Sequence, residues 1–175
     1  MNKIKTLVFS ALLTLGAFAA VTFTSCSTDE CKDVVCNNGG TCITGTCSCA
    51  SGYEGNNCET RSRDRFLNSG VTATFLTALG QDGCYNPGYT MTINPGANAD
   101  EIIINNFAGY GTSATVSGLK VNGTTFTQTG TVTAGAVTIS NITGTISNDG
   151  RTLTFSYRAA DATQTRNCSA SATKQ

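Results

Sequence analysis

The chain contains no histidine and no tryptophan in its 175 residues. It also lacks the serine-hydrolase, phosphate-loop and zinc-protease motifs. Without imidazole, a catalytic base or a metal site would have to come from carboxylates, lysine or tyrosine. We therefore expect a protein that is not an enzyme and that holds no cofactor or metal. The missing tryptophan also weakens the case for a carbohydrate site.

Charge is scarce and balanced, with 11 basic and 11 acidic residues that together make up 13% of the chain. Two of the basic residues, Lys3 and Lys5, belong to an N-terminal leader, so the remainder is weakly acidic. Such a surface does not concentrate nucleic acid or anionic lipid. The composition predicts no nucleic-acid partner.

The leader covers residues 1–25. Its two lysines are followed by an uncharged stretch from residue 6 to 25, which is most apolar between Leu7 and Val21. This order is typical of a signal peptide, and the apolar part is shorter than the roughly 20 residues that span a bilayer. An exported chain reaches an oxidising compartment, where cysteines pair.

The end of the leader, Phe23-Thr24-Ser25-Cys26, resembles the lipobox of bacterial lipoproteins. The resemblance implies that Cys26 is acylated and becomes the mature N-terminus, with residues 26–30 as a lipidated tether to a membrane. Phe23 departs from the family pattern, in which leucine is most usual. The alternative is ordinary signal cleavage after Ala19, which leaves Cys26 a free thiol. The count of nine cysteines favours lipidation, because the other eight then pair without remainder.

The residues behind the lipobox bear on the destination. Ser27 follows the cysteine where Asp would favour retention in the inner membrane, and Asp29-Glu30 is similar to signals that carry lipoproteins of some Gram-negative groups outward. The resemblance implies an outer-membrane lipoprotein at the cell surface. The alternatives are a position facing the periplasm and a stretch of solvated linker without signal value.

Residues 31–59, CKDVVCNNGGTCITGTCSCASGYEGNNCE, hold six cysteines separated by four, five, four, one and eight residues. Six cysteines alone allow 15 pairings. The spacing, with NGGTC at the third cysteine and CSCASGYEGNNC at the end, resembles EGF-like domains. The resemblance implies the disulfides Cys31–Cys42, Cys36–Cys47 and Cys49–Cys58. A module this short cannot bury enough apolar surface to fold unaided, so cross-links replace a core.

Many EGF-like domains bind calcium, and Asp29-Glu30 before Cys31 matches half of that pattern. Ser27 stands where an acidic or amide ligand belongs, and residues 43–46 contain no Asp or Asn. Because calcium takes six or more oxygen ligands, we expect no calcium site. The module then serves as a stiff spacer near the membrane or, alternatively, as a recognition surface.

After a joint at residues 60–65, residues 66–175 predict an all-β domain. Apolar residues recur at every second position and share one face of each expected strand: Val71, Ala73, Phe75, Thr77 and Leu79; Tyr89, Met91 and Ile93; Leu153, Phe155 and Tyr157. The run EIIINNF at residues 101–107 is mainly apolar, with three consecutive isoleucines, which indicates a strand covered on both sides. Asn122-Gly123 and Asp149-Gly150 predict type I′ hairpins, and Asn94-Pro95-Gly96 ends another strand.

The pattern predicts a mainly β chain, with about eight antiparallel strands in a meander barrel or, alternatively, in a two-sheet sandwich. Cys84 and Cys168 are the remaining cysteines, and a bond between them would join the two ends of the domain. The first and last strands of a closed meander are neighbours, so the pair favours the barrel. The domain also resembles lipocalin-like β-domains of bacterial surface lipoproteins.

The acidic residues of this domain are expected to be structural. Asp100 and Glu101 are adjacent, so on a strand they would point to opposite faces. Asp82 and Asp149 precede glycines, which is typical of turns, and Asp161 falls in a loop.

Two groups could contribute to binding. Arg61, Arg63 and Arg65 would share one face of an extended chain and could grip an acidic glycan or a phosphate, or could form a solvated joint. The second group could stack on sugars and consists of tyrosines near loops: Tyr85, Tyr89 and Tyr110.

Together these features predict a membrane-anchored, surface-exposed lipoprotein with a non-catalytic binding, adhesion or envelope-accessory role. A protein or glycan partner fits this role. The alternative is a lipocalin-like carrier of a small apolar ligand, with the ligand against four inward side chains: Phe75, Met91, Ile93 and Phe155.

The cysteine inventory can be checked by mapping peptides of the mature protein without reductant. We expect Cys26 to carry acyl chains and the other eight cysteines to form four disulfides. An unmodified Cys26, or one coupled to another thiol, would contradict both the membrane address and the pairing scheme.

Overall fold

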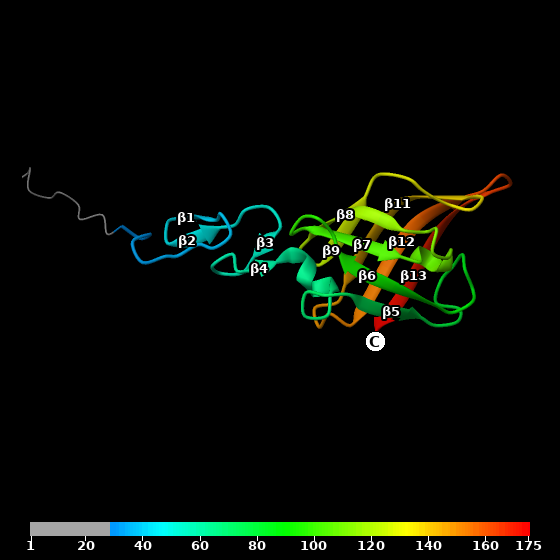
Figure 1. Ribbon diagram of the computed structural model, residues 1–175, viewed down its shortest axis with the longest axis horizontal. Helices are drawn as coiled ribbons and strands as arrows, with labels where there is room; N and C mark the ends of the chain where they lie inside the picture. The colour runs from blue at the N-terminus through cyan, green and yellow to red at the C-terminus, as the bar shows by residue number, and fades with distance from the viewer. Residues whose placement is uncertain (1–28) are drawn as a thin grey trace, which may run out of the picture.

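The computed structural model describes residues 29–175, which form a small disulfide-rich module followed by a β-barrel (Figure 1). The predicted signal peptide at residues 1–25 and the predicted lipidation of Cys26 lie outside the described residues. No helix within residues 29–175 is long and apolar enough to cross a membrane.

The N-terminal module consists of two short hairpins held by disulfides. Strands β1 (Thr41–Ile43) and β2 (Thr46–Ser48) pair with each other, as do β3 (Tyr53–Glu54) and β4 (Thr60–Arg61). The cross-links are those that the EGF-like resemblance implies: Cys31–Cys42, Cys36–Cys47 and Cys49–Cys58. Their Cα–Cα distances of 5.3–5.8 Å are ordinary for disulfides.

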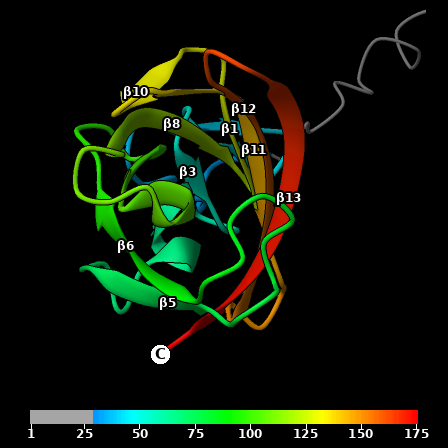
Figure 2. The ribbon, with the colours of Figure 1, turned by 90° about the vertical axis from the view of Figure 1, so that its right-hand side faces the viewer.

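The second module is a closed antiparallel barrel of eight strands (Figure 2). Each strand pairs with the next along the chain, and the last pairs with the first, which confirms the barrel over the sandwich. A short extra strand, β10 (Val132–Ala134), pairs beside β11. The barrel strands are β5 (Ala73–Thr77), β6 (Tyr89–Pro95), β7 (Glu101–Asn105), β8 (Val116–Asn122), β9 (Thr125–Gln128), β11 (Val137–Ile146), β12 (Thr152–Ala160) and β13 (Thr165–Lys174).

The predicted faces are confirmed within the strands. The alternating residues of β5, β6 and β12 all point into the barrel and are buried, whereas Val71 and Leu79 lie beyond the ends of β5 and are exposed. The prediction of a doubly covered strand at residues 101–107 is wrong. In β7 the residues Ile102 and Ile104 are fully buried while Ile103 is only half-buried, because a closed barrel covers one face of each strand.

Both ends of the barrel are plugged by short 3₁₀ helices. The helix η1 (Ser62–Phe66) inserts Phe66 against the ring of Phe126 at the end nearer the EGF-like module. The helix η2 (Phe107–Gly109) inserts Phe107 against Phe155 at the opposite end, called the distal end below. The inward side chains of the strands and the two plugs form one buried hydrophobic cluster.

One glycine is required by this packing. A Cβ on Gly144 of β11 would collide with the Phe126 ring. Only glycine leaves room for that ring inside the barrel.

The two hairpins form at the predicted places, but their turn type was predicted wrongly. A type I′ turn needs positive φ at both central residues. Between Asn122 and Thr125 only Gly123 has positive φ, and between Ser147 and Thr152 only Gly150 does. The composition located the turns and did not fix their geometry.

The segment between the modules is ordered and bonded to both. The Ser62 amide donates to the Gly52 carbonyl of the EGF-like module, 2.9 Å away. The Arg63 guanidinium donates to the carbonyls of Gly96 and Asn98 in the loop between β6 and β7. A Cβ on Gly52 would lie 2.9 Å from the Asp100 amide nitrogen, so the modules touch directly.

The disulfide Cys84–Cys168 lies beside the closure of the barrel, with its Cα atoms 5.5 Å apart. Strands β5 and β13 share only two register pairs, Thr173↔Leu76 and Lys174↔Phe75. The adjoining part of the edge of β13 pairs with residues 81–83, through bonds from the Ser171 amide to the Gln81 carbonyl and from the Gly83 amide to the Ser169 carbonyl.

Replacing the plug at the end nearer the EGF-like module tests its contribution. Because Phe66 is fully buried, Phe66→Ala should lower the free energy of unfolding by about 3–5 kcal/mol in chemical denaturation. Leu79→Ala, at an exposed position, is the control and should change it by less than about 0.5 kcal/mol. Equal effects of the two variants would contradict the plugged barrel.

Candidate functional site

The distal end of the barrel gathers four tyrosines around one buried carboxylate. Tyr85 packs against Tyr89 and Tyr110 with ring centroids 5.7 and 5.9 Å apart, and Tyr110 packs against Tyr157 at 6.5 Å. The three tyrosines singled out in the sequence are thus brought together, and Tyr157 joins them from β12. Tyr85 and Tyr110 remain partly exposed.

The carboxylate at the centre is Asp82, which is 4% exposed. It accepts hydrogen bonds from the hydroxyl of Tyr89 at 2.7 Å and from that of Tyr157 at 3.0 Å. The amides of Cys84 and Tyr85 also donate to it, at 2.8 and 3.2 Å. Asp82 was expected to be a structural turn residue, and its bonds to the Cys84 and Tyr85 amides agree with that; its burial and its two tyrosine partners were not predicted.

The electrostatics keep these tyrosines protonated. Burial disfavours the phenolate form and, together with the Asp82 carboxylate, raises the pKa of Tyr89 and Tyr157 well above the usual range. Burial raises the pKa of Tyr110 as well. Hydroxyls that stay protonated at neutral pH act as fixed donors. The arrangement clamps the loop around Asp82 to β6 and β12.

A positive φ at Gly109 allows the cluster to pack closely. A Cβ at this position would lie 2.7 Å from the Tyr85 ring and 2.9 Å from that of Tyr89. The backbone of η2 therefore forms one wall of the tyrosine cluster.

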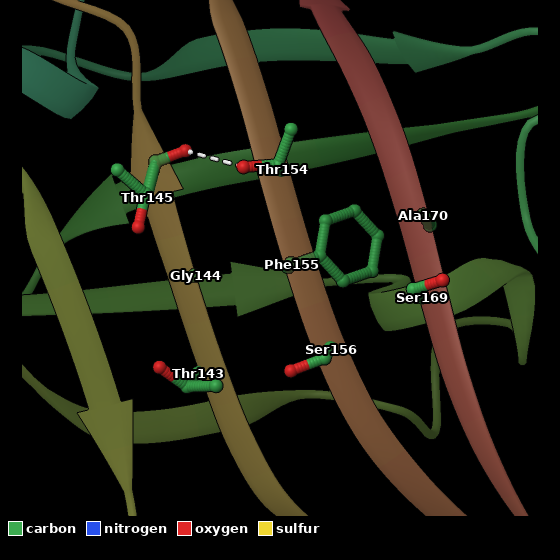
Figure 3. Close-up of a pocket in the computed structure, with 8 residues that line it drawn as sticks. All are labelled: Thr143, Gly144, Thr145, Thr154, Phe155, Ser156, Ser169 and Ala170. Carbon is green, nitrogen blue, oxygen red and sulfur yellow. Dashed lines mark hydrogen bonds between the residues drawn. The ribbon is translucent and has the colours of Figure 1, made fainter.

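A second candidate surface lies on the outside of the barrel, where small hydroxyl side chains from three neighbouring strands surround a shallow hollow of about 430 Å³ (Figure 3). We call these residues the hydroxyl face: Thr143, Thr145, Thr154, Ser156 and Ser169. They point outward because they alternate with the inward residues of β11, β12 and β13. The residues that line the hollow carry no charge.

The hydroxyl face is ordered by strand register. Thr145 lies opposite Thr154, Thr143 opposite Ser156, and Ser156 opposite Ser169. The Thr154 hydroxyl donates to the Thr145 carbonyl at 3.4 Å (Figure 3). Because β-branched threonine has few rotamers, such rows present hydroxyls in a nearly fixed pattern. The surface suits a neutral, polar partner.

The other carboxylates were predicted with mixed success. Asp149 and Asp161 accept backbone bonds within tight turns, as predicted. Asp100 and Glu101 do not diverge, because Asp100 precedes β7, and both contact the Lys120 ammonium at 3.3 and 2.8 Å. Bonds from Lys120 and Asn98 lower the pKa of Glu101 to about 2.

The three arginines do not form a shared binding face. Residues 62–66 turn into η1 and are not extended. Each guanidinium has its own partner: Arg61 pairs with Asp64 at 3.2 Å, Arg65 with Glu54 at 2.7 Å, and Arg63 with backbone carbonyls. The arginines hold the joint together.

The inward side chains proposed for a carrier are part of the packed core. Phe75, Met91 and Ile93 are fully buried, and Phe155 is nearly so. They lie in one cluster with the plugs Phe66 and Phe107. Within residues 29–175, no group of three or more His, Cys, Asp or Glu side chains is arranged to hold a metal ion.

The clamp predicts a loss of stability at alkaline pH. The folded state holds the Tyr157 proton more tightly than the unfolded chain, so this stability is complete below pH of about 10 and is lost as pH rises above it. Tyr157→Phe should flatten the fall of unfolding free energy between pH 9 and pH 11.5, measured by urea denaturation. Tyr53→Phe, in the EGF-like module, is the matched control. An unchanged slope in Tyr157→Phe would contradict the clamp.

Comparison with known proteins identifies one part of the chain. Residues 26–58 match the family model of the EGF-like domain. No curated protein and no solved structure matches the chain. The protein therefore carries an EGF-like domain with three disulfides, followed by a closed eight-stranded β-barrel.

Proposed function

We propose that this protein is a lipoprotein, anchored to the outer membrane through lipid on Cys26, that displays a non-catalytic binding surface at the cell exterior. The observation that carries the proposal is the joint. Arg63 and Gly52 fix the EGF-like module against the barrel, so the two modules form one elongated body with the chain entering at one end (Figure 1).

The filled interior favours a surface role over a carrier role. Its inward positions are occupied by packed side chains, so a ligand would have to bind outside the barrel. Of the two candidate surfaces, the hydroxyl face is a stronger candidate for contact with a partner than the tyrosine cluster, because its uncharged hydroxyls suit a neutral glycan or a polar protein surface. Adhesion and an accessory role in an envelope complex both require such a surface.

The tyrosine cluster at the distal end supports the non-catalytic role in this proposal. Burial and the Asp82 carboxylate raise the pKa of Tyr89 and Tyr157, and the hydroxyls of these two tyrosines already donate to Asp82. A general acid or base works best with a pKa near the operating pH. The cluster therefore acts in folding, as the clamp of the loop around Asp82.

The anchor can be tested by cell fractionation of a bacterium that expresses the chain. Wild-type protein should float with membranes and should carry acyl mass at Cys26, whereas Cys26→Ser should be soluble. Ser27→Ala preserves the cysteine and is the control. A non-permeant amine reagent should label wild-type protein on intact cells.

Two results would overturn parts of the proposal separately. If Cys26→Ser floated like wild type, lipid on Cys26 would not be the anchor. If wild-type protein were labelled only after lysis, the surface position would be wrong while the anchor stood.

A further inference from the structure

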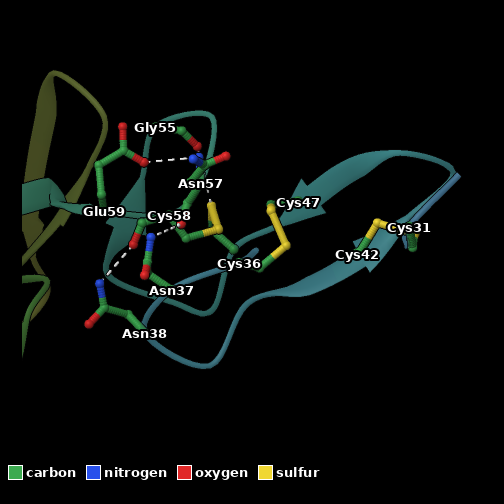
Figure 4. Close-up of a disulfide and its surroundings, with 11 residues drawn as sticks. Cys31, Cys36, Asn37, Asn38, Cys42, Cys47, Gly55, Asn57, Cys58 and Glu59 are labelled. Carbon is green, nitrogen blue, oxygen red and sulfur yellow. Dashed lines mark hydrogen bonds between the residues drawn. A yellow bond between two sulfur atoms is a disulfide. The ribbon is translucent and has the colours of Figure 1, made fainter. Parts of the chain in front are cut away.

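The EGF-like module carries two exposed apolar side chains. Ile43 is 56% exposed and Val35 is 71% exposed. Ile43 ends β1 beside the tight turn Thr44-Gly45, and the neighbouring disulfide Cys31–Cys42 lies at the end away from the barrel (Figure 4). Val35 lines one hollow with Gly45 and Thr46 beside that turn and with three polar residues, Asp33, Asn56 and Asn57. We call the segment around Ile43 and Val35 the apolar tip.

The chain enters the structure at this same place. A Cβ on Gly45 would lie 3.5 Å from the Glu30 carbonyl oxygen. Glu30 is four residues after Cys26, and an extended chain spans at most about 3.3–3.6 Å per residue. A lipid on Cys26 therefore keeps Glu30 within about 14 Å of the acylated residue. That reach is comparable to the headgroup layer, because headgroups add about 10–15 Å in total to a hydrocarbon core of about 30 Å.

Isolated exposed apolar residues are common on proteins and need no explanation by themselves. Val71, Leu76 and Leu79 are such residues on the barrel. The apolar tip differs because the short tether holds it against a lipid surface. Contact with that surface would remove its apolar side chains from water at no further cost in translational freedom.

We propose that the apolar tip lies in the headgroup layer of the anchoring membrane, with Ile43 and Val35 inserted toward the acyl chains. This inference rests on the proposed lipidation of Cys26. The charged residues beside the tip are Asp29, Glu30, Lys32 and Asp33, a net acidic set, so the fitting surface is zwitterionic and not anionic. The contact turns the distal end of the barrel away from the membrane.

The absence of native tryptophan provides a clean probe. Ile43→Trp places a single tryptophan at the tip, and Leu79→Trp places one at an exposed site beyond β5, on the barrel. The full lipidated protein is reconstituted into phosphatidylcholine vesicles with and without brominated acyl chains. We expect Ile43→Trp to lose most of its emission in brominated vesicles and Leu79→Trp to keep its emission.

A second measurement avoids introducing a membrane-seeking ring. Lys32 lies beside the tip and Lys120 lies on the barrel, so their modification by a water-soluble amine reagent can be compared by mass spectrometry. In vesicles, Lys32 should react more slowly relative to Lys120 than it does in the unlipidated Cys26→Ser protein. Val35→Ser/Ile43→Ser should restore the ratio.

The outcomes separate this inference from the proposed function. Protein that lacks acyl mass and does not float with vesicles would refute the anchor itself. Acylated, floating protein in which Ile43→Trp is no more quenched than Leu79→Trp, or in which Lys32 stays as reactive as in Cys26→Ser, would refute only the membrane contact of the tip.

Discussion

Closure of the barrel depends on the seam between β5 and β13, where the first and last strands of the domain meet. Regular pairing there is brief, and the remainder of the seam is built by the loop after β5. That loop bonds to β13 through its backbone, to β6 and β12 through Asp82, and to β13 again through Cys84–Cys168. A cross-link over 84 residues is of the size that most restricts an unfolded chain. The seam thus combines covalent, polar and backbone restraints at the point where a meander sheet would otherwise open.

The interior and the exterior of the barrel follow opposite rules because each strand alternates between them. Inward positions carry phenylalanine, isoleucine and alanine, with glycine where a ring needs space. Outward positions on β11, β12 and β13 carry threonine and serine, which favour extended backbone without adding apolar surface. The same alternation therefore produces a solid core and a neutral hydroxyl surface. Both features favour the proposed binding of partners at the outer surface of the barrel.

Local patterns in the sequence predicted an all-β domain of about eight strands but left a barrel and a two-sheet sandwich both open. Period-two alternation identified inward faces, and the resemblance to EGF-like domains implied the three disulfides of the first module that the structure contains. The features that were missed depend on contacts between distant residues. Asp82 resembles a turn residue locally, and its partner Tyr157 comes from a strand 75 residues away. Lys120 draws Asp100 and Glu101 together only because β7 begins after Asp100.

Other predictions were wrong because the composition of a segment does not determine its backbone geometry or how many of its faces are covered. An apolar run such as residues 101–107 reports how much surface is apolar and not how many faces are covered. A pair such as Asn122-Gly123 locates a reversal of the chain, while the φ values at that turn are set by the twist of the flanking strands.

The plug Phe66 limits how the EGF-like domain and the barrel can be recombined with other domains. The helix that follows the EGF-like domain supplies a core residue of the barrel, and Arg63 in the same helix is bonded to a barrel loop. The boundary between the domains therefore does not coincide with the boundary between their cores. Genetic exchange of one EGF-like domain for another would preserve the barrel only if the breakpoint fell before residue 62. The incoming domain would also need a glycine at the position where Gly52 contacts Asp100.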